Sequence, residues 1–73
     1  MEVNNMFYRI IVYRWDEKTP SAVIDLNVKE NAWFLYHRYF EIAVQQSENI
    51  NLMELYEMNP EKNTSVQLSA CSF

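Results

Sequence analysis

The sequence predicts an α+β fold in two layers, an antiparallel sheet of three to four strands packed on one long helix in the order β-β-α-β-β. A β-branched and aromatic run opens the chain, a helical pattern occupies its middle, and two shorter alternating segments close it. The chain has 73 residues, the length of one domain. We expect residues 1–73 to form that domain, with an ordered core over 6–70 and a tail over 71–73.

The first predicted strand is Met6–Trp15, whose sequence MFYRIIVYRW is β-branched and aromatic. Apolar side chains fall on both of its alternating faces, which is typical of a central strand covered on both sides. The polar segment 16–21 contains Pro20 and has the length of a hairpin loop. A second strand, 22–28, alternates and predicts one buried and one wet face. Its inward residues are Ala22, Ile24, Leu26 and Val28, and its outward residues are Val23, Asp25 and Asn27.

A helix is predicted from Val28 to Ser47. Asn27 and Glu30 have the spacing of a capping box, with the cap at Asn27 or one or two residues later. We expect Asn49 to end the helix in the left-handed conformation that glycine usually takes. Apolar side chains cover roughly 200° of the helix, where a helix lying on a sheet needs a little over 100°. This arc comprises Ala32, Trp33, Leu35, Tyr36, Tyr39, Phe40, Ile42, Ala43 and Val44.

The segment 50–58, INLMELYEM, fits either a strand or a short helix, because Leu, Met and Glu favour a helix. We favour the strand. Residues 59–63 then form a turn, and TSVQLSA over 64–70 alternates as a closing hairpin strand does. In that strand we expect one face to hold Val66, Leu68 and Ala70.

The composition excludes several classes of enzyme. The chain has no glycine, although average usage gives roughly five in this length. Walker loops, dinucleotide fingerprints and nucleophile elbows all need glycine and are therefore ruled out. His37 is the single histidine and Cys71 the single cysteine, too few for a zinc site or an intrachain disulfide. We expect no enzyme, no catalytic residue, no metal and no cofactor.

The charge is acidic and unevenly distributed. The net charge is −4, and residues 48–73 carry −3 of it because their four glutamates are accompanied only by Lys62. This balance disfavours nucleic acid, whose phosphates need clustered Lys and Arg, and it suits a basic protein surface. No segment has the roughly 18 apolar residues of a membrane span. We therefore expect a cytoplasmic protein with no membrane partner.

Three segments carry a resemblance to a known class of protein: the hairpin MFYRIIVYRW–DEKTPS–AVIDLNV, the helix opening KENAWFLYHRY and the acidic strand NLMELYEM. In this order, in a short acidic chain, they are similar in layout to small phage-encoded inhibitors. These include anti-CRISPR proteins, inhibitors of host RNA polymerase and phage antitoxins that block host toxins. The resemblance implies a stoichiometric blocker of a functional surface on a larger machine, acting in the host cytoplasm as a monomer or a homodimer.

The leading prediction is a non-catalytic protein-binding inhibitor that occludes a functional surface of a larger host complex, one that handles nucleic acid. Such a protein is phage-encoded and of the anti-CRISPR or anti-defence type. Aromatic side chains would anchor the contact, and glutamates would steer it towards a basic groove. Phe34 is singled out because its direction falls on the otherwise polar face of the helix. The predicted partner-binding residues are Tyr13, Trp15, Trp33, Phe34, Glu54, Glu57 and Glu61.

Two alternative functions remain open. The aromatic residues of the first strand are interleaved with Arg9 and Arg14 and could form a stacking platform for single-stranded nucleic acid. The two arginines, however, point to opposite faces of that strand. The broad apolar arc of the helix instead fits a homo-oligomeric structural component, in which two copies pack Trp33, Phe40 and Val44 against each other.

Overall fold

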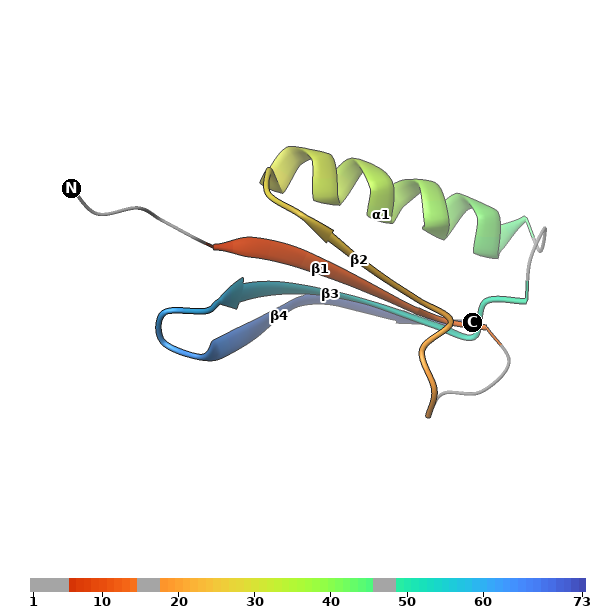
Figure 1. Ribbon diagram of the computed structural model, residues 1–73. Coiled ribbons are helices and arrows are strands. Elements are labelled where there is room, and N and C mark those ends of the chain that lie inside the picture. Colours follow the sequence, from red (N-terminus) through yellow and green to blue (C-terminus); the bar gives the residue numbers. More distant parts are fainter. Residues whose placement is uncertain (1–5, 15–17, 46–48) are drawn as a thin grey trace.

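The computed structural model describes residues 6–14, 18–45 and 49–73, and Figure 1 shows how their elements are arranged. The four strands form one antiparallel sheet, and the helix lies on one face of it. The predicted α+β class, with a four-stranded antiparallel sheet and one helix, is confirmed. In chain order the elements are β1 Phe7–Tyr13, β2 Ala22–Leu26, α1 Lys29–Val44, β3 Leu52–Asn59 and β4 Thr64–Ser72.

The sheet has the strand order β2-β1-β3-β4, so β1 and β3 are central and β2 and β4 are the edges. Ile10 pairs with Ile24 on one side and with Leu55 on the other. The prediction that the first strand is central is confirmed. The prediction that it is covered on both faces is wrong, because α1 covers one face and the described residues place no second layer on the other (Figure 1).

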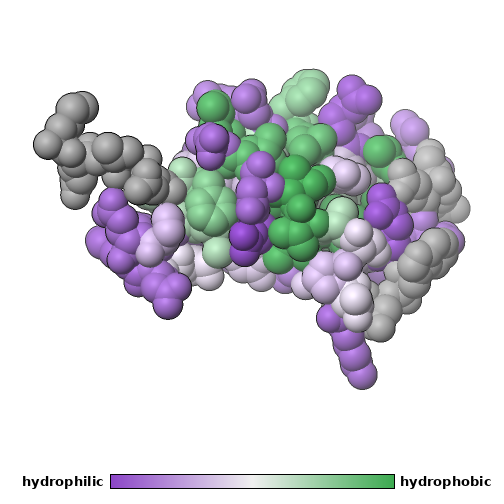
Figure 2. All heavy atoms as spheres, viewed as in Figure 1, coloured by the Kyte–Doolittle hydropathy of each residue, from purple (hydrophilic) through white to green (hydrophobic). Residues whose placement is uncertain are grey.

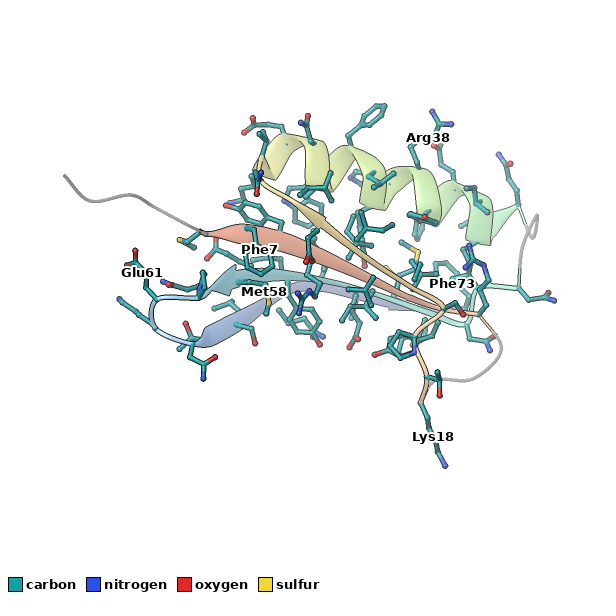
Figure 3. All side chains as sticks on the ribbon, in the orientation of Figure 1. Phe7, Lys18, Arg38, Met58, Glu61 and Phe73 are labelled. Atoms are coloured by element: carbon teal, nitrogen blue, oxygen red, sulfur yellow. The ribbon has the colours of Figure 1, made fainter. Side chains whose placement is uncertain are left out.

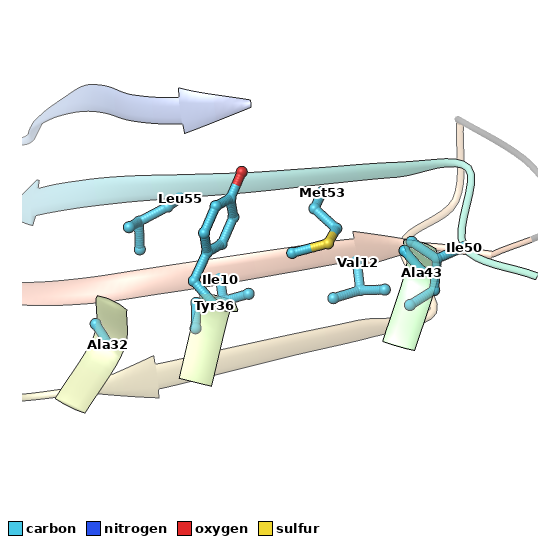
Figure 4. Close-up of a cluster of buried hydrophobic side chains, with 8 residues drawn as sticks. All are labelled: Ile10, Val12, Ala32, Tyr36, Ala43, Ile50, Met53 and Leu55. Carbon is cyan, nitrogen blue, oxygen red and sulfur yellow. The ribbon is translucent and has the colours of Figure 1, made fainter. Parts of the chain in front are cut away.

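The core lies between α1 and the sheet, where eight buried side chains meet (Figure 4). The central strands contribute Ile10, Val12, Met53 and Leu55, which have no exposed surface. Burying an aliphatic side chain of this size contributes about 1.5–3 kcal/mol, so these four residues are a main source of stability. The other four are Ala32, Tyr36, Ala43 and Ile50.

Tyr36 is the largest of the eight and links the helix to the far edge strand. Its hydroxyl points towards β4 (Figure 4) and donates a hydrogen bond to the Cys71 Sγ atom at 3.6 Å. Burial raises the pKa of Tyr36 to about 12, because a phenolate here would lose its hydration. The prediction of a tail over 71–73 is wrong. β4 continues through Ser72, and the Phe73 N–H donates to the Asn51 carbonyl at 2.9 Å.

The N-terminus of α1 agrees with its prediction in part. The helix begins at Lys29 with Val28 as its N-cap, one residue after Asn27, which is one of the predicted positions. Val28 makes no side-chain capping bond, so the capping box of Asn27 and Glu30 is wrong. Val28 is exposed, although the strand pattern predicts that it faces inward. Glu30 still favours this end of the helix, because a negative charge in the first turn complements the helix dipole.

The C-terminus of α1 differs as well. The helix ends at Val44, and its C-cap, Gln45, is right-handed, while the predicted end at Ser47 lies outside the described residues. Because the C-cap is Gln45, the prediction that Asn49 ends the helix is wrong. A left-handed asparagine occurs instead at Asn63, with φ 53° in the β3–β4 turn. Asn tolerates this region because its short polar side chain can bond locally. In the part of the chain that the structure describes, no helix combines the length and apolar content that crossing a membrane requires.

The wide apolar arc of α1 extends beyond what the sheet covers, as predicted. The helix makes its main contacts with β1 and β2 (Figure 1). Leu35, Tyr39 and Ile42 are half-buried against the core. Phe40 and Val44 remain exposed at the margin of the arc.

The C-terminal hairpin combines a confirmed prediction with a correction. Residues 52–58 of the ambiguous segment 50–58 belong to the strand β3, the alternative that we favour. The pairing of β3 with β4 shifts after Leu55, which leaves Leu68 as an extra residue in β4. Because of this bulge Val66 and Ala70 lie on opposite faces of the sheet, and the prediction that they share one face is wrong.

Candidate protein-binding surface

The sheet surface opposite α1, which we call the open face, carries four rows of side chains. Successive residues of a strand point to opposite faces, so the residues that alternate with the core positions point here. Each row consists of residues that are paired across neighbouring strands. The rows are Tyr13, Leu52 and Ser72; Val23, Ile11, Glu54 and Ala70; Asp25, Arg9, Tyr56 and Gln67; and Phe7, Met58 and Ser65.

The open face has an apolar centre and a polar rim. The central strands β1 and β3 place aromatic and aliphatic side chains on it, each of them half-buried. The edge strands add mainly short or polar residues, such as Asp25, Ser65 and Gln67. Protein interfaces have this anatomy, with Tyr, Phe, Met and Arg enriched at the centre. The apolar residues at the centre are Phe7, Ile11, Tyr13, Leu52, Tyr56 and Met58.

One side of this face holds an ion pair between neighbouring strands. Arg9 donates two hydrogen bonds to the Asp25 carboxylate, from Nε to Oδ1 at 2.8 Å and from an Nη atom to Oδ2 at 3.0 Å. The hydrogen bonds from the guanidinium hold the pKa of Asp25 below its ordinary value. The Arg9 guanidinium also lies 5.4 Å from the centre of the Phe7 ring. A carboxylate and an aromatic ring therefore hold the charge of Arg9 inside the face.

The middle of the open face holds a second carboxylate with neutral partners. The Glu54 Oε2 atom accepts hydrogen bonds from the Tyr56 hydroxyl at 2.9 Å and from the Gln67 side-chain amide at 3.2 Å. The same amide donates to the Tyr56 hydroxyl at 3.1 Å. Burial, and after it the nearby Glu54 carboxylate, raises the pKa of Tyr13 and of Tyr56. Two phenols and an amide thus surround one acidic group.

Two shallow hollows lie at the end of the open face near the β3–β4 turn, each with a volume of about 250 Å³. Both include Met58 and Ser65 in their walls. Figure 3 shows Phe7 and Met58 side by side at this end. The walls of one hollow also include Arg9, Ile11 and Tyr56. Ile11 is the direct cross-strand neighbour of Glu54.

A separate apolar surface lies on the flank of α1 next to β2. Figure 2 shows apolar atoms gathered in the middle of this side of the molecule. Phe34 is 66% exposed there, which confirms that its side chain faces away from the core. It borders a groove of about 340 Å³ whose walls are Arg14, Phe34, Leu35, Arg38, Tyr39 and Ile42.

The structure brings together two of the predicted partner-binding residues, Tyr13 and Glu54, on the open face. Glu57 lies on the opposite face, where its carboxylate is next to Tyr8 and contributes to the raised pKa of that phenol. Glu61 lies in the exposed β3–β4 turn (Figure 3). The three glutamates therefore do not form one acidic patch.

The remaining predicted anchors are on the helix or outside the described part of the chain. Trp33 is half-buried against the core, and its ring meets the Tyr36 ring edge-on at 5.8 Å. Phe34 points away on the other flank, so neighbouring positions of α1 serve different surfaces. Trp15 lies outside the described residues.

Sequence reasoning missed Tyr56, Met58 and Gln67. The first two follow Glu54 at intervals of two along one strand, and that alternation was the signal that could have identified them. Gln67 gave no such signal, because the bulge at Leu68 decides which residue of β4 is opposite Tyr56.

The open face provides hydrogen-bonding, ionic and apolar contacts of the kinds used in molecular recognition. Its carboxylates, phenols and guanidinium can bind charged and polar groups, and its aromatic centre can be desolvated by a partner. No protein-family model, curated protein or solved structure matches this chain. The geometry of the open face is therefore the basis for a functional assignment.

Proposed function

We propose that this chain is a non-catalytic protein-binding inhibitor that uses the open face to cover a functional surface of a larger host complex. The observation that carries the proposal is the apolar centre and polar rim on a sheet surface that α1 leaves uncovered. A half-exposed cluster of aromatic and aliphatic side chains gains free energy when a partner removes it from water. On this proposal the protein acts in the host cytoplasm and blocks by occupancy.

The charge of the chain supports a basic partner. The net charge is −4, and Glu54 contributes a negative charge at the centre of the face, while Arg9 and Asp25 offset each other. Opposite charge on a partner would raise the association rate and fix the orientation of docking. Host complexes that handle nucleic acid have basic grooves that meet this requirement.

The same charges make the nucleic-acid platform the weaker alternative. Aromatic rings are present on the open face, but its cation, Arg9, is held by Asp25. Glu54 would also lie close to the phosphates of a bound strand, and like charges at that distance repel. We expect no binding of a fluorescent oligothymidine at low salt, measured by anisotropy. A strong signal that falls steeply with salt would support the platform instead.

The proposal is tested with Met58→Asp, which places a charge among the apolar side chains of the open face. The matched control is Val66→Asp, which introduces the same charge at an exposed position on the opposite face of the same hairpin. Tagged wild-type protein and both variants are used to capture binding proteins from bacterial lysate, and thermal unfolding is followed for each. We expect the wild type and Val66→Asp to retain the same host protein, and Met58→Asp to lose it while remaining folded.

Two results would contradict the proposal. One is equal capture by Met58→Asp and by the wild type, which would exclude the open face as the contact. The other is a dimer in sedimentation that Met58→Asp dissociates, with no host protein captured. That outcome would assign the face to self-association.

A further inference from the structure

We infer that Glu54 is the receptor for one arginine side chain of the partner, with the guanidinium placed beside the rings of Tyr13 and Tyr56. The inference depends on the proposed function, because it assumes that a protein docks on the open face. It adds the chemical group that the partner must present at the centre of the contact.

The position of Glu54 favours this role. Its row lies between the row that begins with Tyr13 and the row that contains Tyr56. Tyr13 is therefore diagonal to Glu54 across the β1–β3 pair, and Tyr56 follows it by two residues on the same strand. Diagonal and same-face neighbours in a sheet lie within reach of aromatic side chains. A cation bound to the carboxylate would lie close to two aromatic rings.

The hydrogen bonds around Glu54 leave it able to bind a cation. The bonds from Tyr56 and Gln67 both end on Oε2 and come from neutral groups. The Tyr13 phenol, also neutral, makes a further side-chain hydrogen bond with Glu54. A carboxylate can accept about four hydrogen bonds, so these donors fix its orientation without exhausting its capacity or neutralising its charge. Burying such a carboxylate under a partner is costly unless the partner supplies a positive charge.

The other carboxylate of the face shows how a guanidinium is held here. Asp25 binds Arg9 through two hydrogen bonds, and the same guanidinium lies 5.4 Å from the centre of the Phe7 ring. One carboxylate is therefore already occupied by a guanidinium near an aromatic ring. Glu54 offers a carboxylate beside aromatic rings, and among the described residues its hydrogen-bond partners are neutral.

Arginine fits this site better than lysine. Its planar guanidinium can bond to both carboxylate oxygens and stack on an aromatic ring, whereas an ammonium group is a compact charge that retains more water. A hollow of about 250 Å³, lined in part by Met58 and by Ile11, the cross-strand neighbour of Glu54, can take the aliphatic part of the side chain. Arg9 also lines this hollow, but Asp25 offsets its charge.

The experiment uses N-acetyl-arginine amide as the probe and N-acetyl-citrulline amide as its neutral isostere. Both are titrated into the isotope-labelled full chain, and the amide signals of Glu54, Tyr56 and Gln67 are followed by NMR. We expect saturable shifts with the arginine probe in the millimolar range and roughly tenfold weaker binding of citrulline, because the charge-assisted bond is lost. Glu54→Gln should weaken arginine binding to the level of citrulline, and Glu61→Gln, which removes the same charge in the turn, should not.

The inference is overturned if the arginine probe gives no saturable shift, or if citrulline binds equally well to the wild type. The citrulline comparison needs no variant, so it remains decisive if Glu54→Gln fails to fold. The two proposals can also fail separately. If Met58→Asp abolishes capture of a host protein but the arginine probe does not bind, the open face is the contact and Glu54 is not its arginine receptor.

Discussion

The two faces of the sheet are built from alternating residues of the same strands, yet they differ in how far their side chains are buried. On the face under α1, Ile10, Val12, Met53 and Leu55 have no exposed surface. On the open face, their neighbours along β1 and β3 are mostly apolar or aromatic but remain half-exposed. This chain therefore has more apolar strand surface than its single described helix can cover.

The polar groups of the two faces differ as well. The core contains one polar side-chain atom of note, the Tyr36 hydroxyl, and it bonds to Cys71. The open face has two carboxylates with several donors around them, as in the contacts of Arg9 and Tyr56. A surface that served only to pack within its own core would not need these carboxylates and their hydrogen-bond donors. Their presence supports the proposal that a partner contacts the open face.

The largest expected effect is a difference in the loss of stability between a substitution on the core face and one on the open face. Leu55→Ala should lower the free energy of unfolding by about 2–5 kcal/mol, because it leaves a cavity in the core. Met58→Ala, at a half-buried position on the open face of the same strand, should cost about 1 kcal/mol or less. Urea titrations of both variants measure this difference. Equal losses would mean that the open face is as tightly packed as the core.

The next effect is the dependence of stability on pH above 10. The pKa of Tyr36 rises from 10.0 to about 12 in the folded chain, so its neutral form is favoured by folding. This stabilisation is complete below pH 10 and is lost as the pH rises to about 12. Since one pKa unit corresponds to about 1.4 kcal/mol, the loss is on the order of 2 kcal/mol.

Tyr36→Phe should remove much of this alkaline loss, because the variant has no phenol to ionise in the core. Tyr56→Phe is the control on the open face, where the pKa is also raised but the ring is less buried. Unfolding in urea at several pH values between 9 and 12 measures both slopes. A slope in Tyr36→Phe as steep as in the wild type would show that other groups cause the alkaline unfolding.

A smaller effect concerns the ion pair of the open face. Arg9→Gln should cost less than about 1 kcal/mol, because both side chains of the pair are partly exposed to solvent. The lowered pKa of Asp25 stabilises the fold above its ordinary value of 3.8 and loses this contribution as the pH falls below it. Arg9→Gln should therefore flatten the acid limb of the stability curve. An unchanged acid limb would leave the pair without a measurable role in folding.

The smallest effect is expected on the helix flank. Phe34→Ser changes a side chain that is 66% exposed, so the free energy of unfolding should change by no more than about 0.5 kcal/mol. Thermal unfolding measures this, with Trp33→Ser as the neighbouring half-buried comparison. A loss in Phe34→Ser as large as in Trp33→Ser would place Phe34 among the residues that hold the helix on the sheet.

Several elements follow from local patterns in the sequence. The β-branched run around Ile10 and the two-residue alternation of Ala22, Ile24 and Leu26 predict the first hairpin, because these patterns need only neighbouring residues. The wide apolar arc of the helix is also visible in the sequence, as is the outward direction of Phe34. Helix ends were less predictable, since Val28 caps α1 with its backbone alone and leaves no side-chain signature.

The candidate site was only partly predictable. Tyr13 and Glu54 were both selected as contact residues, but they were selected separately, because they are far apart in the sequence and meet through the pairing of β1 with β3. Glu57 was selected with Glu54 on charge alone, although an odd spacing along a strand places them on opposite faces. Gln67 could not be predicted as part of the site, because the bulge in β4 sets its register.

Composition and local pattern predict an α+β chain with an acidic charge, a central apolar strand and more apolar surface than one helix needs. These properties depend on residue types and on periodicities of two and about 3.6 residues. Which face of β1 the helix covers, and which residues share the open face with Glu54, follows from the tertiary structure. Both apolar faces of β1 look alike in the sequence, and long-range strand pairing and the side on which α1 packs distinguish them.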